Sequence, residues 1–572
     1  SEQFSIAVTV TTTGTSTAEG LIVGVQDAAG LTSLDNATAV TNETGAATFT
    51  ITESSPDTYS PTFSVVGNST ATTNATITVD NGAVRTYTRE DNTELTAVYR
   101  GNGTPDSPYL IDTLADLQSI NIDSGTRNEH YRLAADIDAS ATNDSSWNGG
   151  SGFEPITDFT GSLNGDGYAI SNLSIDRGNE ASVGLFGDTN AGSSITNVTL
   201  VQPAVTGGQG TGPLVGSHGG SISRTVVTGG TATTEADGEA HLGGLVGILV
   251  DDAKITQSHT SAIVDANGHN EAGGFAGDIG SNARVEQVSA TGGVKNGGSE
   301  IGGLFGNASS GSEIVEAFAA GNVSGTTNVG GLLGRQDGSA VTVDRAYWDE
   351  QSTGQTSSAG DTETALPTVK MQGTAATEFM PGLNFTTTWN TTRDYPVLQA
   401  QTTGTEQPPR TVDTIEATGA TGVQSEAVAI TLTVTTTDGD PRDGFVITAR
   451  DAAGLTDLEN ATATTDQSGT ATFTVTESNA STYEPTFEVA GNSTVSTTTN
   501  LTVEEGVVRT YTREDTTQLT ATYLGNGTSE NPYLIDSLAD LQAINNSTTA
   551  RNDHYRLAAD FDASATNDSS WN

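Results

Sequence analysis

The chain has 572 residues, no cysteine and a formal net charge of −49, from 70 acidic and 21 basic side chains. Without cysteine it can form neither a disulfide nor a thiolate metal site. Without a basic stripe, binding to nucleic acid is not expected. No apolar stretch approaches the roughly 20 residues that a membrane-spanning helix needs, so we expect no membrane insertion within these residues.

The acidic residues are spread along the chain and do not form a tail. This pattern is typical of a folded protein with a strongly hydrated acidic surface, whose self-repulsion is screened in concentrated salt. The simplest interpretation is a protein from a very salty environment. The alternatives are an acidic surface protein from an ordinary medium and a protein that takes up Ca²⁺.

Internal repetition organises the sequence. Residues 1–148 and 425–572 are two copies of one segment without insertion or deletion, so that Tyr87 matches Tyr511 and Trp147 matches Trp571. A unit of this size copied head to tail predicts a string of modules and not a single catalytic body. Because the second copy stops at Asn572, in the middle of the unit, we expect that the chain either continues or docks this end on another protomer.

Residues 1–97 alternate apolar and polar side chains in short runs such as 4–11 and 46–52, with turn signals around Gly30 and Gly45. This alternation indicates β-strands, and about seven strands in such a length predict an immunoglobulin-like (Ig-like) β-sandwich. The run Gly-Ala-Ala-Thr-Phe-Thr-Ile that begins at Gly45 resembles the Ig-like modules strung along bacterial and archaeal surface proteins. Residues 425–521 keep the pattern and predict a second Ig-like β-sandwich.

Residues 98–400 open with the one convincing helix of the chain, at 114–120, for which Asp112 or Thr113 would be the N-cap. A Gly-Gly-Leu-x-Gly pentad then recurs about every 29 residues. Its six copies occupy 183–187, 212–216, 243–247, 273–277, 302–306 and 330–334, and the first two lack one glycine each. The pentad resembles the GLUG motif, which is found in large secreted and cell-surface proteins, adhesins among them.

A period of this length suits one coil of a parallel β-solenoid, or β-helix, made of several short strands. We therefore predict a GLUG-type β-solenoid over 98–400, with the helix as its N-terminal cap. Equivalent residues of successive coils should stack, and the predicted stack consists of Leu185, Leu214, Leu245, Phe275, Leu304 and Leu332. The residue after each of these should point to the opposite face, and the glycine that closes each pentad should form a corner with positive φ.

The far end of the solenoid needs a cover as well, and Trp348 with residues 379–398 is the candidate. Proline and glycine in 401–424 predict a linker, and residues 522–572 read as the start of a second, truncated solenoid. The predicted fold class is therefore all-β: Ig-like β-sandwiches that alternate with a parallel β-solenoid capped by a short helix.

Little in the sequence points to catalysis. Asp136 and Asp138 would share one face of a strand, as a glycosidase or lyase pair might, but 70 acidic residues produce such spacings by chance. The six histidines lack zinc-binding spacing. We predict no catalytic residue and no cofactor, and leave metal binding unassigned. Ca²⁺ is the weakly supported candidate, through Asp136, Asp138, Asn143 and Asp144, although the spacing does not match an EF-hand.

Asn-x-Ser/Thr sequons are frequent, and several recur in both copies. They predict N-glycosylation of an exported protein, while the alternative is that Asn-Gly-Thr and Asn-Ser-Thr serve as turn residues. The candidate sites are Asn36, Asn68, Asn102, Asn143, Asn172, Asn197, Asn307, Asn322, Asn384, Asn390, Asn460, Asn492, Asn526 and Asn567.

Taken together, the residues favour a non-enzymatic, extracellular structural protein of a halophilic archaeon that forms a tandem-repeat cell-surface stalk, fibre or filament. Its expected partners are further copies of the same repeat and also glycans, with neither nucleic acid nor membrane insertion. The first alternative is a cell-surface adhesin that binds glycans or another cell. The second is a β-helix enzyme that degrades polysaccharides, which would need converging carboxylates in a groove.

Overall fold

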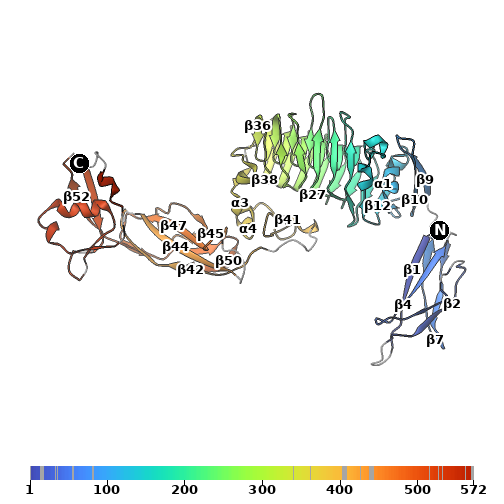
Figure 1. Cartoon of the computed structure of the whole chain (residues 1–572), viewed down its shortest axis with the longest axis horizontal. Coiled ribbons are helices and arrows are strands. Elements are labelled where there is room, and N and C mark those ends of the chain that lie inside the picture. Colours follow the sequence, from blue (N-terminus) through green and yellow to red (C-terminus); the bar gives the residue numbers. More distant parts are fainter. Residues whose placement is uncertain are drawn as a thin grey trace.

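The computed structural model describes residues 2–12, 18–31, 34, 36–53, 57–79, 83–338, 340–360, 362–401, 409–425, 427–436, 443–514, 516–525, 527–530, 532–558, 560 and 562–567. Figure 1 shows the modules in chain order: a sandwich in blue, a wound stack of strands from cyan to yellow, a second sandwich in orange and a small unit in red. Regular structure is almost entirely β, with short helices only. The predicted all-β fold, with its solenoid and helical cap, is confirmed.

The first sandwich is antiparallel. Strand β1 pairs with β4, β5 pairs with β8, and a four-stranded sheet has the order β3-β2-β6-β7. Inside, the rings of Phe49 and Phe63 lie 4.8 Å apart, next to Val8, Val23 and Ala47. The strands are β1 (Glu2–Thr9), β2 (Ile22–Asp27), β3 (Thr38–Val40), β4 (Ala46–Glu53), β5 (Asp57–Tyr59), β6 (Thr62–Val65), β7 (Asn68–Asn74) and β8 (Ile77–Val79).

The second sandwich repeats this layout and adds two strands in front of it. They are β42 (Val412–Thr418), which pairs with β44, and β43 (Ala420–Val423), which pairs with β51. The other strands are β44 (Ala427–Thr436), β45 (Val446–Asp451), β46 (Thr462–Thr464), β47 (Thr470–Thr476), β48 (Ser481–Tyr483), β49 (Thr486–Val489), β50 (Asn492–Thr498) and β51 (Leu501–Glu504).

The linker predicted over 401–424 is therefore wrong from Val412 onward. Val412, Ile415 and Val423 are buried, the first two in the core of the second sandwich. Their burial outweighs the glycine signal that suggested a linker, because Gly422 itself lies within β43. Residues 402–408 of the predicted linker lie outside the described part of the chain.

The solenoid winds as parallel strands, so that successive coils add strands to the same sheets. One sheet contains β17 (Phe186–Thr189), β21 (Val215–His218), β26 (Val246–Leu249), β30 (Ala276–Ile279), β34 (Phe305–Ala308) and β37 (Leu333–Gln336). A second contains β16 (Ser174–Asp176), β20 (Ala204–Gly207), β24 (Thr231–Thr234), β28 (Ile263–Asp265) and β32 (Val294–Lys295). A third contains β25 (Leu242–Gly243), β29 (Ala272–Gly273), β33 (Ser299–Gly302) and β36 (Thr327–Gly330).

The largest solenoid sheet runs the whole length of the coil stack. Its first row is β11 (Tyr109–Ile111), β12 (His130–Leu133), β14 (Ser162–Asn164), β18 (Ser194–Thr196), β22 (Ser221–Ser223), β27 (Lys254–Thr260), β31 (Arg284–Ala290), β35 (Glu313–Ala319), β38 (Thr342–Asp349) and β39 (Thr364–Leu366). A parallel row of β13 (Ile137–Asp138), β15 (Ala169–Ser171), β19 (Thr199–Val201) and β23 (Val226–Thr228) merges with it at β27.

The pentads lie on successive coils in one register. The backbone amide of Leu245 donates to the carbonyl of Phe275, and that of Phe275 donates to Leu304, each at 2.9 Å. The residues after them are paired in the same way along β26, β30 and β34. Both columns belong to one fully buried core, contrary to the expectation of opposite faces. The reason is that each leucine of the pentad lies in a bend just before its strand, where strand alternation does not apply.

The closing glycines also differ from the prediction. They do not adopt positive φ; left-handed backbone occurs instead at Glu271, Glu300 and Asn328, just before the pentads. Glycine is required at the closing position because the neighbouring coil is too close. A Cβ atom on Gly247 would lie 2.5 Å from the amide nitrogen of Thr211, inside van der Waals contact.

The N-terminal end of the solenoid is covered by a hairpin and a helix. The hairpin of β9 (Ala83–Thr88) and β10 (Glu94–Tyr99) carries Tyr99, whose buried ring lies 5.1 Å from that of Tyr109 in the solenoid core. The sandwich predicted over 1–97 therefore ends before β9, because this last hairpin packs its aromatic face on the coils. Helix α1 (Leu114–Gln118) is capped by Thr113 in a capping box with Asp116.

At the other end, Trp348 is buried in the solenoid core and donates its Nε1 hydrogen to the Gln355 carbonyl, at 3.0 Å. The segment predicted to close this end packs instead on the outer face of the last coils, around Phe318 and Tyr347. Residues 379–398 contain β40 (Trp389–Asn390), β41 (Val397–Leu398) and the last residue of α4 (Ala375–Phe379), and they follow α2 (Glu350–Thr353) and α3 (Thr368–Met371) in the chain. We call α3 and α4 the solenoid cap.

The small C-terminal unit repeats the covered N-terminal end of the solenoid. Its rings Tyr523, Tyr533 and Tyr555 form the same cluster as Tyr99, Tyr109 and their neighbour Tyr131. Its elements are β52 (Val507–Thr512), β53 (Gln518–Tyr523), β54 (Tyr533–Ile535), α5 (Leu538–Ala543) and β55 (Tyr555–Leu557). In the described part of the chain, every helix is too short or too polar to cross a bilayer.

Candidate functional site: the junctions between modules

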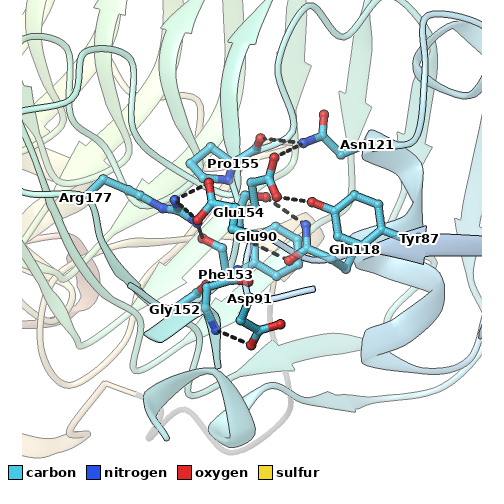
Figure 2. A network of polar contacts seen from close by, with 11 residues as sticks. Tyr87, Glu90, Asp91, Gln118, Asn121, Gly152, Phe153, Glu154, Pro155 and Arg177 are labelled. Atoms are coloured by element: carbon cyan, nitrogen blue, oxygen red, sulfur yellow. Dashed lines mark hydrogen bonds and ion pairs between the residues drawn. The ribbon is translucent and has the colours of Figure 1, made fainter. Parts of the chain in front are cut away.

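A buried polar network fixes the β9–β10 hairpin to the first solenoid coils (Figure 2). The Tyr87 hydroxyl donates to the Glu154 carboxylate, and Asn121 donates to the same carboxylate at 3.3 Å. Gln118 and Glu154 exchange two hydrogen bonds, side chain to backbone, of 2.9 and 3.0 Å. Burial, followed by the contact with Glu154, raises the pKa of Tyr87 well above its ordinary value. The phenol therefore stays protonated and acts as a donor.

The tip of the hairpin is held by charge. Arg177, whose side chain is 3% exposed, donates from Nη1 to both carboxylate oxygens of Glu90, at 2.7 and 2.8 Å. Asp91 binds Arg89 and accepts from the backbone amide of Asn148 at 3.0 Å. The Arg89 hydrogen bond, followed by backbone donors, keeps the pKa of Asp91 well below its usual range. Charged hydrogen bonds of this kind are stronger than neutral ones, so they orient the hairpin on the coils.

One segment of the hairpin thus supplies the whole junction: the side chains of Arg85, Tyr87, Arg89, Glu90 and Asp91 all contact the solenoid. Their partners Glu154 and Arg177 are far away in sequence and lie in no recognisable motif, so the sequence did not reveal them. The second copy keeps part of the junction, because Arg509 donates to Asp553 at 2.5 Å and lies 4.8 Å from the Tyr533 ring.

A second junction joins the solenoid cap to the second sandwich. Ala375 of α4 is buried together with Val446 and Ala490 of the sandwich, and Val369 and Phe379 pack around them. The backbone is equally close, because a Cβ atom on Gly491 would lie 1.9 Å from the Thr374 carbonyl oxygen.

Polar groups around Glu378 complete this second junction. Its carboxylate accepts from the Thr448 hydroxyl at 3.1 Å, the Gly491 amide at 3.0 Å and Arg450 at 2.5 Å. Arg450 also binds Glu488, so that one guanidinium bridges a carboxylate from each module. In the sequence, this contact is signalled only by differences from the first copy, where Arg450 replaces Gln26 and Glu488 replaces Ser64.

The aspartates of the predicted acidic cluster accept backbone hydrogen bonds, two of them within local turns. Asp138 accepts from the Ser140 amide at 3.0 Å, and this hydrogen bond lowers its pKa. Asp144 does the same with the Ser146 amide at 2.8 Å, and Asp136 accepts from Ala169 at 2.9 Å. Within the described ranges, no group of three or more His, Cys, Asp or Glu side chains is arranged to hold a metal ion.

Three histidines of the solenoid contact residues of neighbouring coils. Burial lowers the pKa of His218 and of His259 to about 4. His218 is fully buried, with its Nδ1 2.7 Å from the Thr189 hydroxyl. His241 is paired with Glu271: burial alone lowers its pKa, but the carboxylate outweighs that effect and the pKa is raised.

All six residues of the predicted stack are fully buried in the solenoid core: Leu185, Leu214, Leu245, Phe275, Leu304 and Leu332. They therefore serve packing. Backbone hydrogen bonds between coils connect their positions from Leu214 to Leu332.

The sequon asparagines fall into several groups. Side chains are exposed at Asn36, Asn68, Asn102, Asn143, Asn172, Asn322, Asn384 and Asn460, and partly exposed at Asn197, Asn390 and Asn492. Asn307 is a correction: it is buried and donates to Asp278 at 2.9 Å, which leaves no room for a glycan on the folded chain. Asn526 lies outside the described residues, as does the side chain of Asn567.

Several sequons form a local turn, as the alternative interpretation expected. Asn68, Asn102 and Asn492 each accept a hydrogen bond from the threonine hydroxyl two residues later, at 2.6 to 2.8 Å. Glycosylation at the exposed positions stays a prediction.

The chain is similar to halomucin of the halophilic archaeon Haloquadratum walsbyi, with 85% identity over 572 residues. This match covers 100% of the chain but only 6% of halomucin. A Gly-rich membrane protein of Evansella cellulosilytica is 37% identical over 125 residues, which is 21% of this chain and 14% of that protein. The D0-D1 domain of intimin matches 17% of this chain and 48% of its own, with 21% identity and a TM-score of 0.15. No protein-family model matches the chain.

Proposed function

We propose that the chain is a non-enzymatic structural segment of an extracellular, cell-surface protein of a halophilic archaeon. In this proposal, Ig-like sandwiches and GLUG-type solenoids alternate along a tandem-repeat stalk or fibre. The observation that carries it is the interlocked junction at α4, where Ala375, Val446 and Ala490 are buried together and Arg450 bridges two modules. A contact that is both apolar and charged fixes the angle between neighbours, which a stiff stalk requires.

Two further findings support the proposal. The relative with 85% identity is named as a mucin of a salt-loving organism, and it is far longer than this chain. The net charge of −49 suits a surface exposed to concentrated salt. The burial of His218 and the backbone hydrogen bonds that Asp136 and Asp138 accept favour a structural over a catalytic role for these residues.

Electron microscopy of cell-surface material, labelled with an antibody against residues 98–400, tests the proposal. We expect labelled fibres whose regular spacing equals one sandwich plus one solenoid. Label confined to the cytoplasm, or to isolated compact particles, would contradict it. Mass spectrometry of the same material would show which of the exposed sequon asparagines carry glycans.

Adhesion is the second candidate function, and one groove favours it. This groove, of about 610 Å³, lies on the solenoid beside residues 397–401. Asn197, Arg224, His259 and Gln401 line it with polar groups of the kind that bind sugar hydroxyls. A glycan array probed with the whole chain tests this function, and Arg224→Ala should abolish any binding that uses the groove.

A further inference from the structure

The face of the second sandwich that meets the solenoid cap has an exposed counterpart on the first sandwich. In the second sandwich, Val446 and Ala490 are 2% and 1% exposed because Ala375 of α4 covers them. The matching residues of the first sandwich are Ile22 and Val66, which are 46% and 57% exposed. Both are larger aliphatics than their counterparts, so the uncovered face is the more apolar one.

The backbone that builds this face is the same in both copies. The Val66 amide donates to the Ile22 carbonyl at 2.8 Å, as the Ala490 amide does to Val446 at 2.9 Å. Ile22 is also paired across the sheet with Val40, which is 61% exposed. Ile22, Val40 and Val66 thus form one contiguous patch, which we call the aliphatic face. Adjacent exposed aliphatics of this kind mark an interaction surface.

The glycine of the tight contact is preserved as well. Gly67 has φ +86° and Gly491 has φ +73°, so both backbones adopt the same left-handed turn. A Cβ atom on Gly491 would strike the Thr374 carbonyl, whereas one on Gly67 would meet nothing within 4 Å. The first sandwich therefore keeps the shape that admits a cap backbone, with open space where the cap would lie.

We propose that the aliphatic face binds a solenoid cap equivalent to α3 and α4, supplied by a unit that precedes the first sandwich in a tandem chain. The inference rests on the proposed function and names the partner of its repeating junction. It commits to this occupant because the same face, one repeat later in the same molecule, carries that occupant.

The polar part of the two junctions differs. Arg450, Glu488 and Thr448 correspond to Gln26, Ser64 and Gly24. A cap on the first sandwich would therefore lack the arginine bridge and rely on aliphatic contact. The Gly67 amide and the Gln26 side chain would be the donors to the carboxylate that corresponds to Glu378 in that cap. A junction that buries Ile22 and Val66 is held by apolar contact in place of ion pairs. Salt screens ion pairs but not apolar contacts.

The test uses a concatemer in which residues 1–424 are fused to the full 572-residue chain, so that a cap precedes the first sandwich of the second unit in the natural register. The chain has no cysteine, so two introduced thiols are the only ones. Ala375→Cys in the first unit and Val66→Cys in the second are treated with a short bis-maleimide. The positive control is the natural chain with Ala375→Cys and Ala490→Cys. The negative control pairs Ala375→Cys with Val84→Cys, a valine on the β9–β10 hairpin that is 68% exposed and so at least as accessible as Val66.

We expect the concatemer to crosslink internally with a yield close to that of the positive control. Ile22→Asp in the second unit should abolish this crosslink without unfolding the sandwich, because Ile22 is half exposed. No crosslink beside a working positive control would overturn the inference, and so would crosslinks formed only between separate chains. Either failure leaves the fibre proposal open to its own microscopy test, because modules joined by loose segments would still form a filament.

Discussion

The two sandwiches are copies of one sequence segment, yet they bury their side chains to different extents. Ile430 and Val434 of β44 are fully buried, whereas the matching Ile6 and Val10 are only partly buried. Strands β42 and β43 account for much of the difference because they pair with β44 and β51 of the second copy. The comparison teaches that a sandwich of this kind is completed by residues that come before its repeat unit.

The largest effect is expected from deleting one core ring in each copy. Phe49→Ala and Phe473→Ala remove rings that lie 4.8 and 4.7 Å from their partners, Phe63 and Phe487. Each should lower the free energy of unfolding by about 3–5 kcal/mol. We expect the first sandwich to unfold at room temperature and the second to remain folded, because β42 adds Val412 and Ile415 to the core of the second. Hydrogen exchange of β4 and β47 measures this, and equal protection in both variants would break the comparison.

A matched glycine pair isolates the contribution of the cap. Gly67→Ala and Gly491→Ala both force alanine into left-handed backbone, at a cost of about 1–2 kcal/mol. Only Gly491→Ala also clashes with Thr374, which should add roughly 1–3 kcal/mol of overpacking. Thermal unfolding and exchange at α4 measure the difference. Equal losses in the two variants would mean that the cap contact does not persist in solution.

Acid should lower the stability of the solenoid through a buried histidine, and this pH dependence distinguishes the unfolding of the solenoid from that of the two sandwiches. The folded-state pKa of His218 is about 4, below the unfolded value of 6.5. Between these two pH values the unfolded chain therefore binds more protons than the folded chain. The contribution of His218 to the free energy of unfolding is fully present above pH 6.5 and is lost as the pH falls toward 4. The loss amounts to roughly 3 kcal/mol. The solenoid melting temperature, followed from pH 7 to pH 4, should fall less steeply in His218→Asn than in the unmodified chain.

The smallest effect concerns the arginine that differs between the copies. Arg450→Gln gives the second sandwich the residue of the first and leaves Glu378 and Glu488 without their shared cation. Because the Arg450 side chain is 43% exposed, solvent screening limits the loss to about 1 kcal/mol. The reverse change, Gln26→Arg, should be neutral in the isolated chain. Proteolysis between the cap and β42 reports the loosening, and an unchanged cleavage rate would argue against a clamp.

The sequence was most informative where a local pattern matched a local structure. One large buried apolar residue and one glycine per coil indicated the solenoid, and Thr113, one of the two expected N-caps, begins the helix. The pattern did not reveal why the glycines are needed, because Gly247 is constrained by Thr211 of another coil and not by its own φ.

Contacts between modules were largely hidden from the sequence. Glu90 and Arg177 are 87 residues apart, and each is an ordinary charged residue in a chain full of charge. The β9–β10 hairpin looked like a sandwich strand because alternation does not tell which neighbour a strand will pack on. Comparing the two copies would have been the better guide, since the substitution of Gln26 by Arg450 coincides with the clamp.

The covered first coil of the solenoid affects how such molecules coexist at high density. An open stack of parallel strands offers its terminal edge to any similar stack, and such edges fuse proteins into aggregates. Here Tyr99 of the β9–β10 hairpin and helix α1 pack on the first coil. A second solenoid that approaches this end therefore meets the hairpin and the helix in place of a bare strand edge, which hinders growth by strand addition there.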